Sequence, residues 1–283
     1  MRTARFLHLG ICFLALISGR PSTVLAQETL PAYLQDRGPG IPSSMFGTYI
    51  KKGQLLVYPF YETYYDRNAE YEPNDFGYGL TQEFRGQTQA SEALIFIGYG
   101  LSDRLAIEVE AAVITAEIEK AVNDPSAMPA ELKESGLGDV ESQLRWRWFE
   151  EKEGRPELFS YFETVFPLQK TRKLIGTRDW EFKLGTGIVK GFTWGTITIR
   201  TAVDYSREDR KFSAGEYAVE YLKRVSKSFR LYLGVEGTQD EAAVIPEIQW
   251  QFNSHAFLKI NNGFGLTSKA TDFSPEIGVM LSF

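Results

Sequence analysis

Cysteine and histidine are scarce in this chain of 283 residues, which has one cysteine, Cys12, and two histidines, His8 and His255. Cys12 and His8 belong to an N-terminal segment, residues 1–26, that has the pattern of a cleaved signal peptide. Without that segment the chain has no disulfide, no thiol nucleophile and no cysteine-based metal site. A lone His255 cannot form the usual histidine-based metal site either. We therefore predict no metal and no cofactor.

Long apolar runs are also missing. No run of about 18 apolar residues occurs after Gln27, so the sequence offers no transmembrane helix. The formal net charge of the whole chain is −6, and it becomes about −9 by the same count without the three arginines of residues 1–26. This acidic balance argues against a nucleic-acid partner.

The N-terminal segment supports export. Arg2 and Arg5 precede an apolar run from Phe6 to Ile17, and Val24-Leu25-Ala26 has the small-residue form of a signal peptidase site. We predict cleavage near Ala26.

The rest of the sequence is rich in residues that alternate between apolar and polar. Leu144, Trp146 and Trp148 alternate with Arg145 and Arg147, which is the period-two pattern of a strand whose two faces meet different surroundings. A slightly negative mean hydropathy is compatible with membrane strands, because they point only every second residue at lipid. The pattern predicts twelve strands, at residues 54–65, 91–100, 105–119, 140–148, 158–167, 180–190, 195–206, 216–225, 230–239, 244–253, 256–265 and 274–283.

The predicted connections and aromatic residues indicate a transmembrane barrel. Bacterial barrels have an even number of strands, short periplasmic turns, longer outer loops and an aromatic girdle at each membrane interface. Here short connections at 101–104, 150–156, 191–194, 226–229 and 253–255 alternate strictly with longer ones at 66–90, 120–137, 168–178, 207–215, 239–243 and 266–273. The predicted periplasmic girdle contains Tyr99, Trp148, Phe149, Phe192, Trp194, Phe229, Trp250, Phe252, Phe257 and Phe283, and the outer girdle Phe166, Trp180, Tyr205, Tyr217 and Phe264.

The C-terminal strand carries a first resemblance. Residues 275–283 alternate and end on Phe283, so this strand resembles the closing strand of bacterial outer-membrane β-barrels. The resemblance implies that Phe283 takes part in recognition by the barrel-insertion machinery.

Three further stretches carry a second resemblance. Glu134-Ser135-Gly136-Leu137-Gly138-Asp139-Val140, Phe166-Pro167 and the glycine-rich run 183–190, together with the terminal Phe, resemble the outer-membrane barrels grouped with the MetA pathway of phenol degradation. The likeness spans roughly the C-terminal two-thirds of the mature chain and leaves residues 27–90 unmatched. It implies an outer-membrane location and a transport role but no particular substrate.

We therefore predict an all-β fold, a single antiparallel transmembrane β-barrel of about twelve strands, at residues 53–283. Its location is the outer membrane of a Gram-negative bacterium, where lipid and lipopolysaccharide surround it. Residues 27–52 contain several prolines and glycines and are predicted to be irregular. They form either a disordered periplasmic leader or a plug inside the barrel.

The predicted inward faces carry charges of both signs. Eight strands enclose a filled interior and 16 or more leave an aqueous channel, so twelve permit a narrow channel without requiring one. The favoured function is a narrow passive channel for small solutes, organic ones included. The alternative is a filled structural or interaction barrel that acts through its outer loops. The residues predicted to set lumen selectivity are Arg145, Arg147, Arg200, Arg224, Glu141, Glu163 and Asp204.

An outer-membrane enzyme is the third possibility. The only histidine after the signal peptide, His255, follows Asn253 and Ser254 in a predicted periplasmic turn, and adjacent turn residues rarely place a general base within reach of a nucleophile. The stretch 136–139 lacks the lysine and helix of a phosphate-binding loop and is predicted to lead from a loop into a strand, with Asp139 as a turn former. We predict no catalytic residues.

Overall fold

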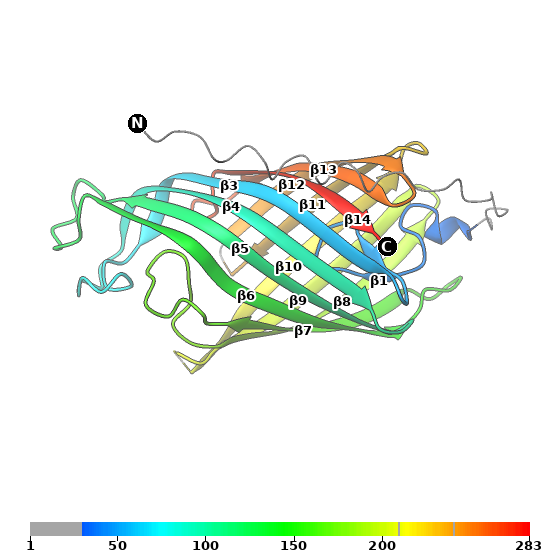
Figure 1. Ribbon diagram of the computed structural model, residues 1–283, viewed down its shortest axis with the longest axis horizontal. Helices are drawn as coiled ribbons and strands as arrows, with labels where there is room; N and C mark the ends of the chain where they lie inside the picture. The colour runs from blue at the N-terminus through cyan, green and yellow to red at the C-terminus, as the bar shows by residue number, and fades with distance from the viewer. Residues whose placement is uncertain (1–29, 209, 240) are drawn as a thin grey trace, which may run out of the picture. The chain divides into compact units, whose positions relative to one another are not determined.

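The protein is a closed barrel of twelve antiparallel strands, seen in a computed structural model that describes residues 30–208, 210–239 and 241–283 (Figure 1). The predicted signal peptide and its cleavage point lie outside these residues. No helix in the described ranges has the length and apolar character needed to cross a membrane. The predicted fold class and strand number are confirmed.

Each barrel strand pairs with the next along the chain, and β14 closes the ring by pairing with β3. The strands are β3 (Leu55–Tyr71), β4 (Phe84–Gly100), β5 (Leu105–Glu119), β6 (Glu131–Phe149), β7 (Glu157–Phe166), β8 (Glu181–Phe192), β9 (Gly195–Ser206), β10 (Lys211–Arg224), β11 (Phe229–Thr238), β12 (Glu241–Asn253), β13 (Ala256–Gly265) and β14 (Phe273–Ser282).

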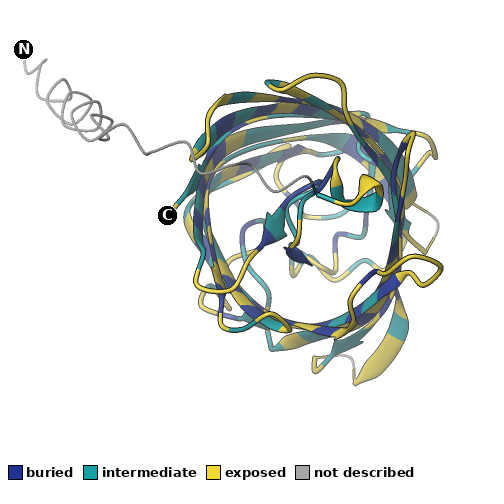
Figure 2. Ribbon diagram, turned by 90° about the vertical axis from the view of Figure 1, so that its right-hand side faces the viewer, coloured by how far each residue is buried: buried dark blue, intermediate teal, exposed yellow. Residues whose placement is uncertain are grey.

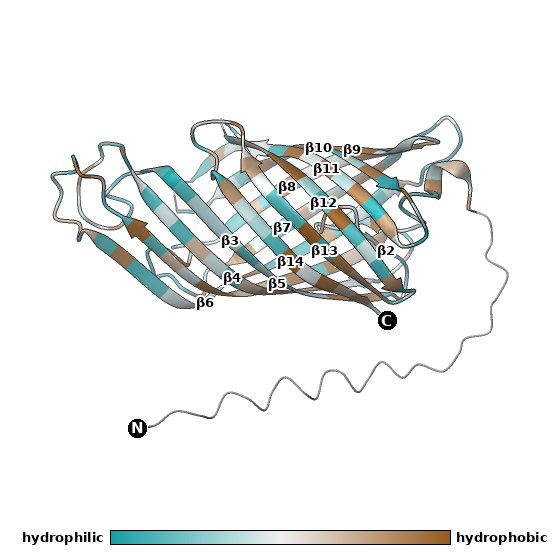
Figure 3. Cartoon of the chain, turned by 90° about the horizontal axis from the view of Figure 1, so that it is seen from above, coloured by the Kyte–Doolittle hydropathy of each residue, from teal (hydrophilic) through white to brown (hydrophobic). Residues whose placement is uncertain are grey.

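Apolar side chains cover the outside of the barrel, as the alternation predicts. Leu144 and Trp146 of β6 are exposed on the outer surface, whereas Arg145 and Arg147 between and beside them are buried toward the lumen. The same alternation of hydrophobic and hydrophilic residues runs along the other strands (Figure 3). An exterior of this kind suits lipid and leaves the polar side chains to line the interior.

Aromatic residues gather at both ends of the barrel wall. We call the end with connections 101–104, 150–156, 193–194, 225–228 and 254–255 the turn end, and the opposite end the loop end. Stacked pairs such as Phe192–Trp194 lie at the turn end, and Phe166–Trp180 lies at the loop end. The assignment of Phe257 to the periplasmic girdle is wrong, because its ring is buried on the lumen side of β13.

All the loop-end connections except 167–180 are shorter than predicted, and the strict alternation of lengths is wrong. Strands β4 and β6 begin at Phe84 and Glu131, so the connections there shrink to 72–83 and 120–130. Only two positions, 239 and 240, separate β11 from β12, and Gln239 has a positive φ. Sequence periodicity weakens where a strand leaves the membrane, because both faces then meet water and the strand continues without an amphipathic signal.

The extended ends of β3–β6 are held together by a small apolar cluster. Tyr71, Phe84, Ile118 and Met128 pack together there. The Tyr71 hydroxyl donates to Asp124 (2.9 Å) and accepts from a backbone N–H of the 120–130 loop. Burial raises the pKa of Tyr71. The cluster orders the loop end above the lumen.

The stretch 136–139 lies inside β6 rather than before it, which corrects the predicted loop. A β-bulge interrupts the β5–β6 register at this point, and Gly136 has a φ of 152°. The Asp139 carboxylate accepts hydrogen bonds from the backbone N–H groups of Leu168, Gln169 and Thr177. Asp139 therefore orders the 167–180 loop.

The glycine-rich run in β8 makes room for aromatic rings in the lumen. A Cβ on Gly185 would lie 2.1 Å from the Tyr161 ring, and one on Gly187 would lie 2.4 Å from the Phe159 ring. These two rings, from the neighbouring strand β7, cover the β8 backbone. The glycines are thus explained by close packing on the inner face.

Residues 31–52 lie inside the barrel at the turn end, within the ring of strands in Figure 2. We call them the inner segment. It contains the short helix η2 (Ala32–Leu34) and two strands, β1 (Ile41–Pro42) and β2 (Tyr49–Ile50), which pair as a separate hairpin. The expectation of an irregular segment missed this hairpin, because two-residue strands leave no period to detect. Ile41 and Ile50 are 1% exposed in the lumen core.

Candidate functional site

The candidate site is the charged lumen that the inward faces of β3–β14 create. On one side, strands β7–β11 carry cations and carboxylates that are bonded to each other, and we call this side the paired wall. Lys183 lies 2.9 Å from Glu163, and Arg200 lies 2.9 Å from Glu220 and 3.1 Å from Glu236. Each cation therefore serves carboxylates on neighbouring strands.

On the other side, carboxylates face each other without a cation between them. We call Glu62, Glu92, Glu110, Glu141 and Glu276, which lie on β14 and β3–β6, the acidic wall. Strand register places Glu276 opposite Glu62 and Glu62 opposite Glu92, while Glu110 lies opposite Glu141. Within the described residues none of the five has an ion pair, although Tyr58 donates a hydrogen bond to Glu276. Like charges directly opposite each other on adjacent strands are destabilising.

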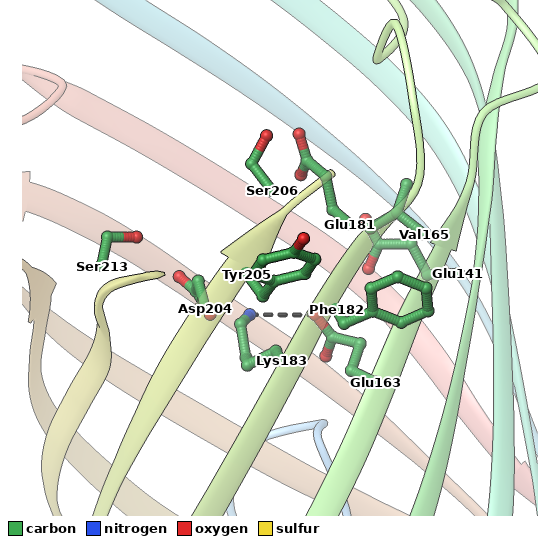
Figure 4. Close-up of a pocket in the computed structure, with 10 residues that line it drawn as sticks. All are labelled: Glu141, Glu163, Val165, Glu181, Phe182, Lys183, Asp204, Tyr205, Ser206 and Ser213. Carbon is green, nitrogen blue, oxygen red and sulfur yellow. Dashed lines mark ion pairs between the residues drawn. The ribbon is translucent and has the colours of Figure 1, made fainter. Parts of the chain in front are cut away.

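Two adjoining cavities occupy the loop half of the lumen. The first, about 350 Å³, is lined by carboxylates from both walls together with Lys183 (Figure 4). The second, about 330 Å³, lies against the acidic wall. They share Glu141, Val165 and Glu181. The loop half of the barrel is thus hollow and predominantly acidic.

The inner segment closes the turn half, and buried ion pairs hold it there. Arg37 donates to Glu157 (2.8 Å) and to Glu151 (3.0 Å), and all three side chains are at most 2% exposed. Arg147 and Lys190 complete this cluster through the same two carboxylates. Removing one member of such a buried network leaves an uncompensated charge, so the anchor is strong as long as it is complete.

The tip of the inner segment reaches between the two walls. The Ser44 hydroxyl donates to Glu108 (2.6 Å), and Arg145 bonds both to Glu108 (3.1 Å) and to the Pro42 carbonyl (2.9 Å). On the other side of the tip, the Phe46 ring lies 5.4 Å below the Arg200 guanidinium. The inner segment is therefore bound by charged and polar contacts at Arg37 and at its tip, while Ile41 and Ile50 pack into the apolar core of the lumen.

Seven residues were predicted to set selectivity, and the structure separates them into three groups. Glu141, Glu163 and Asp204 meet around the first cavity. Arg145 and Arg147 lie in the closed turn half, where they bond to buried carboxylates. The remaining two are Arg200, at the centre of the paired wall, and Arg224, an exposed residue at the turn end whose backbone N–H donates to Asp36.

Some residues that matter to the site were not predicted from the sequence. Glu62 shares the inward parity of Phe60 on β3 and Glu92 that of Leu94 on β4, so both could have been found by extending the alternation. Arg37 and its buried partners could not have been found in this way, because no sequence pattern near Arg37 indicates that it contacts β7.

The residues that could support catalysis or metal binding make contacts that stabilise a turn. The Asn253 side chain accepts a hydrogen bond from the His255 backbone (2.7 Å), and His255 Nδ1 lies 3.1 Å from the Ser282 carbonyl. These contacts form an exposed turn. Among the described residues no group of three or more histidine, cysteine or acidic side chains is arranged to hold a metal ion.

In comparison with known proteins, no family model and no curated protein sequence matches the chain. Solved structures do match. An outer membrane channel from Pseudomonas putida F1 aligns with a TM-score of 0.61 and 13% identity, over 86% of this chain and 100% of that one. The translocator domain of the autotransporter NalP from Neisseria meningitidis aligns with a TM-score of 0.51 and 9% identity, over 82% and 89%. At these identities the likeness concerns the fold. The chain has the fold of bacterial outer-membrane β-barrels.

Proposed function

We propose that the protein is a narrow passive channel for small solutes, organic molecules included, in the outer membrane of a Gram-negative bacterium. One observation carries the proposal: an apolar exterior with aromatic residues at both ends surrounds a lumen that is hollow and charged in its loop half. Such an exterior suits a membrane, and a filled structural barrel has no need of the cavities. The turn end then faces the periplasm, and lipopolysaccharide surrounds the loop end.

The inner segment acts as the gate of this channel. It occupies the turn half and is held there through Arg37 and the Ser44–Glu108 contact, and a further cavity of about 410 Å³ lies between it and the wall at Arg147 and Glu157. Solutes pass when the segment shifts and the charged groups of its Arg37 anchor become hydrated. No catalytic role is proposed for any residue.

Single-channel conductance in a planar bilayer tests the proposal. The chain from Gln27 to Phe283 is compared with a variant lacking residues 27–52, and we expect discrete steps that grow in the variant. Arg37→Ala keeps the segment and removes its anchor, and it should also raise conductance. Arg155→Ala is the matched control, because this arginine lies at the same end but is exposed and bonds only a backbone carbonyl. Silence from all four proteins, each shown to be folded, would contradict the channel.

That silence would favour the second candidate function, a filled barrel that acts through its outer loops. The observation on its side is the ordered apolar cluster under connections 72–83 and 120–130. Deleting residues 122–128 while preserving the barrel would then abolish partner binding and leave folding intact.

We also propose that Phe283 is the contact for the insertion machinery. Its backbone pairs with Leu55 in both directions (2.9 and 3.0 Å), while its ring is 70% exposed. The ring is therefore available to another protein. Phe283→Ala should slow insertion of the chain in cells but leave refolding of the purified protein into detergent unchanged.

A further inference from the structure

We infer that the acidic wall is a binding site for small organic cations, molecules with an ammonium group and a short apolar body. The inference rests on the proposed channel and names the solute class that its loop half prefers. It is carried by three features: opposed carboxylates, buried acceptors that lack donors, and an apolar strip beside them.

The opposed carboxylates come first. Glu110 and Glu141 are directly paired across β5 and β6, and Glu62 lies between Glu92 and Glu276. Five like charges on adjacent strands of one wall repel each other, and a proton or a cation among them relieves the repulsion. The paired wall meets the same requirement with Lys183 and Arg200, whereas the acidic wall has no ion pair within the described residues. A soluble cation would supply the missing charge.

Two buried acceptors give an independent indication. Glu108 and Gln143 are neighbours across β5 and β6, and their side chains line a small space next to Glu110 and Glu141. The Oε1 atoms of Glu108 and Gln143 are buried and have no hydrogen-bond partner, although the residues are only 2% and 6% exposed. Buried acceptors are costly without a donor. An ammonium group provides several N–H donors and would satisfy them.

The apolar strip defines the rest of the ligand. Leu94, Ala112 and Ile114 line the cavity of about 330 Å³ together with Ile175 of the 167–180 loop, beside the carboxylates of Glu110 and Glu141. A bare metal ion gains nothing from such a surface, and the described carboxylates are not grouped for direct coordination. A cation with an apolar body would contact both the carboxylates and the apolar residues that line the cavity.

The test uses benzylammonium, which is charged at neutral pH and carries three N–H donors, and benzenesulfonate as the anion of similar size. Equilibrium dialysis against the folded chain from Gln27 to Phe283 in detergent micelles measures binding without requiring transport. We expect benzylammonium to bind and benzenesulfonate not to bind. The double variant Glu110→Gln/Glu141→Gln should weaken binding about tenfold, because a cleft lined by one charge concentrates its counter-ion by about that factor or more.

The matched control is Glu119→Gln/Glu131→Gln. These two glutamates are also directly opposed on β5 and β6, but they are exposed at the loop end. The control should bind benzylammonium like the unchanged protein. Equal binding by both double variants, or no binding at all, would overturn the inference.

Reversal potentials in a gradient of benzylammonium chloride then separate this inference from the channel itself. If the protein conducts with a preference for the cation, and Glu110→Gln/Glu141→Gln loses that preference, the result supports both the channel and the cation site. Conductance with no such preference overturns the inference and keeps the channel. Binding without conductance in any salt keeps the site and contradicts the channel.

Discussion

The paired wall and the acidic wall are built by the same rule but differ in how their charges are arranged. Both present polar side chains to the lumen from alternate strand positions. On the paired wall Arg200 lies within 3.1 Å of a carboxylate on each of two neighbouring strands, β10 and β11. On the acidic wall Glu110 has another carboxylate as its neighbour in the register. The carboxylates of the paired wall have cationic partners within the protein. Those of the acidic wall have none among the described residues.

The difference shows that alternation decides which face a charge occupies but not what it meets there. A carboxylate beside a cation contributes to stability only if the pair stays intact, because breaking it leaves a buried charge. A carboxylate beside another carboxylate reduces stability, and its retention in a hollow part of the lumen suggests a functional role.

The largest expected effect on stability comes from removing the central cation of the paired wall. Arg200→Leu leaves the carboxylates of Glu216, Glu220 and Glu236 without their shared cation and should lower the free energy of unfolding by about 3–5 kcal/mol. The measurement is urea unfolding in lipid vesicles, followed by tryptophan fluorescence. Arg224→Leu is the control, since Arg224 is exposed and has no ion pair among the described residues. An equal loss in both variants would contradict the role given to Arg200.

A smaller effect tests the outer surface that both walls share. Leu144→Arg places a charge on the exposed apolar face of β6 and should cost about 2–4 kcal/mol if this position lies near the bilayer midplane. The same unfolding assay applies. Leu168→Arg, in the exposed 167–180 loop, should cost little. If Leu144→Arg inserted and unfolded like Leu168→Arg, the assignment of faces would be wrong.

A third effect concerns the inner segment where it meets the acidic side. Ser44→Ala removes the hydroxyl that donates to Glu108 and should cost about 1 kcal/mol, because one hydrogen bond to a buried carboxylate is lost. Limited proteolysis should cut residues 31–52 faster in this variant. Ser43→Ala is the neighbouring control, since its hydroxyl bonds only the Met45 carbonyl within the segment. Equal cleavage of both variants would argue against an anchor at Ser44.

The smallest effect has the opposite sign. Glu110→Gln/Glu141→Gln removes a pair of opposed like charges and should raise the free energy of unfolding by about 0.2–1 kcal/mol. Urea unfolding at low salt is the sensitive measurement, because salt screens the repulsion. A loss of stability instead would mean that the protein itself satisfies these carboxylates, and the two walls would then be alike.

Much of the fold could be predicted from the sequence. Twelve strands and their inward and outward faces follow from the period of two, as in Leu144, Arg145 and Trp146, because that signal lies within a single strand. The errors have equally local causes. Phe257 was assigned to the girdle by its position near a strand end, although its parity with Lys259 places it inside. The β4 and β6 boundaries moved because the amphipathic signal fades outside the membrane.

The sequence by itself determined that the chain forms strands with one apolar and one charged face, since that property needs only neighbouring residues. The tertiary structure decided which charges meet. Arg37 reaches Glu157 across 120 residues of sequence, and Glu110 faces Glu141 only because of the β5–β6 register. Coulomb and hydrogen-bond energies depend on distances of a few ångströms. Those distances exist only once the barrel has closed around the inner segment.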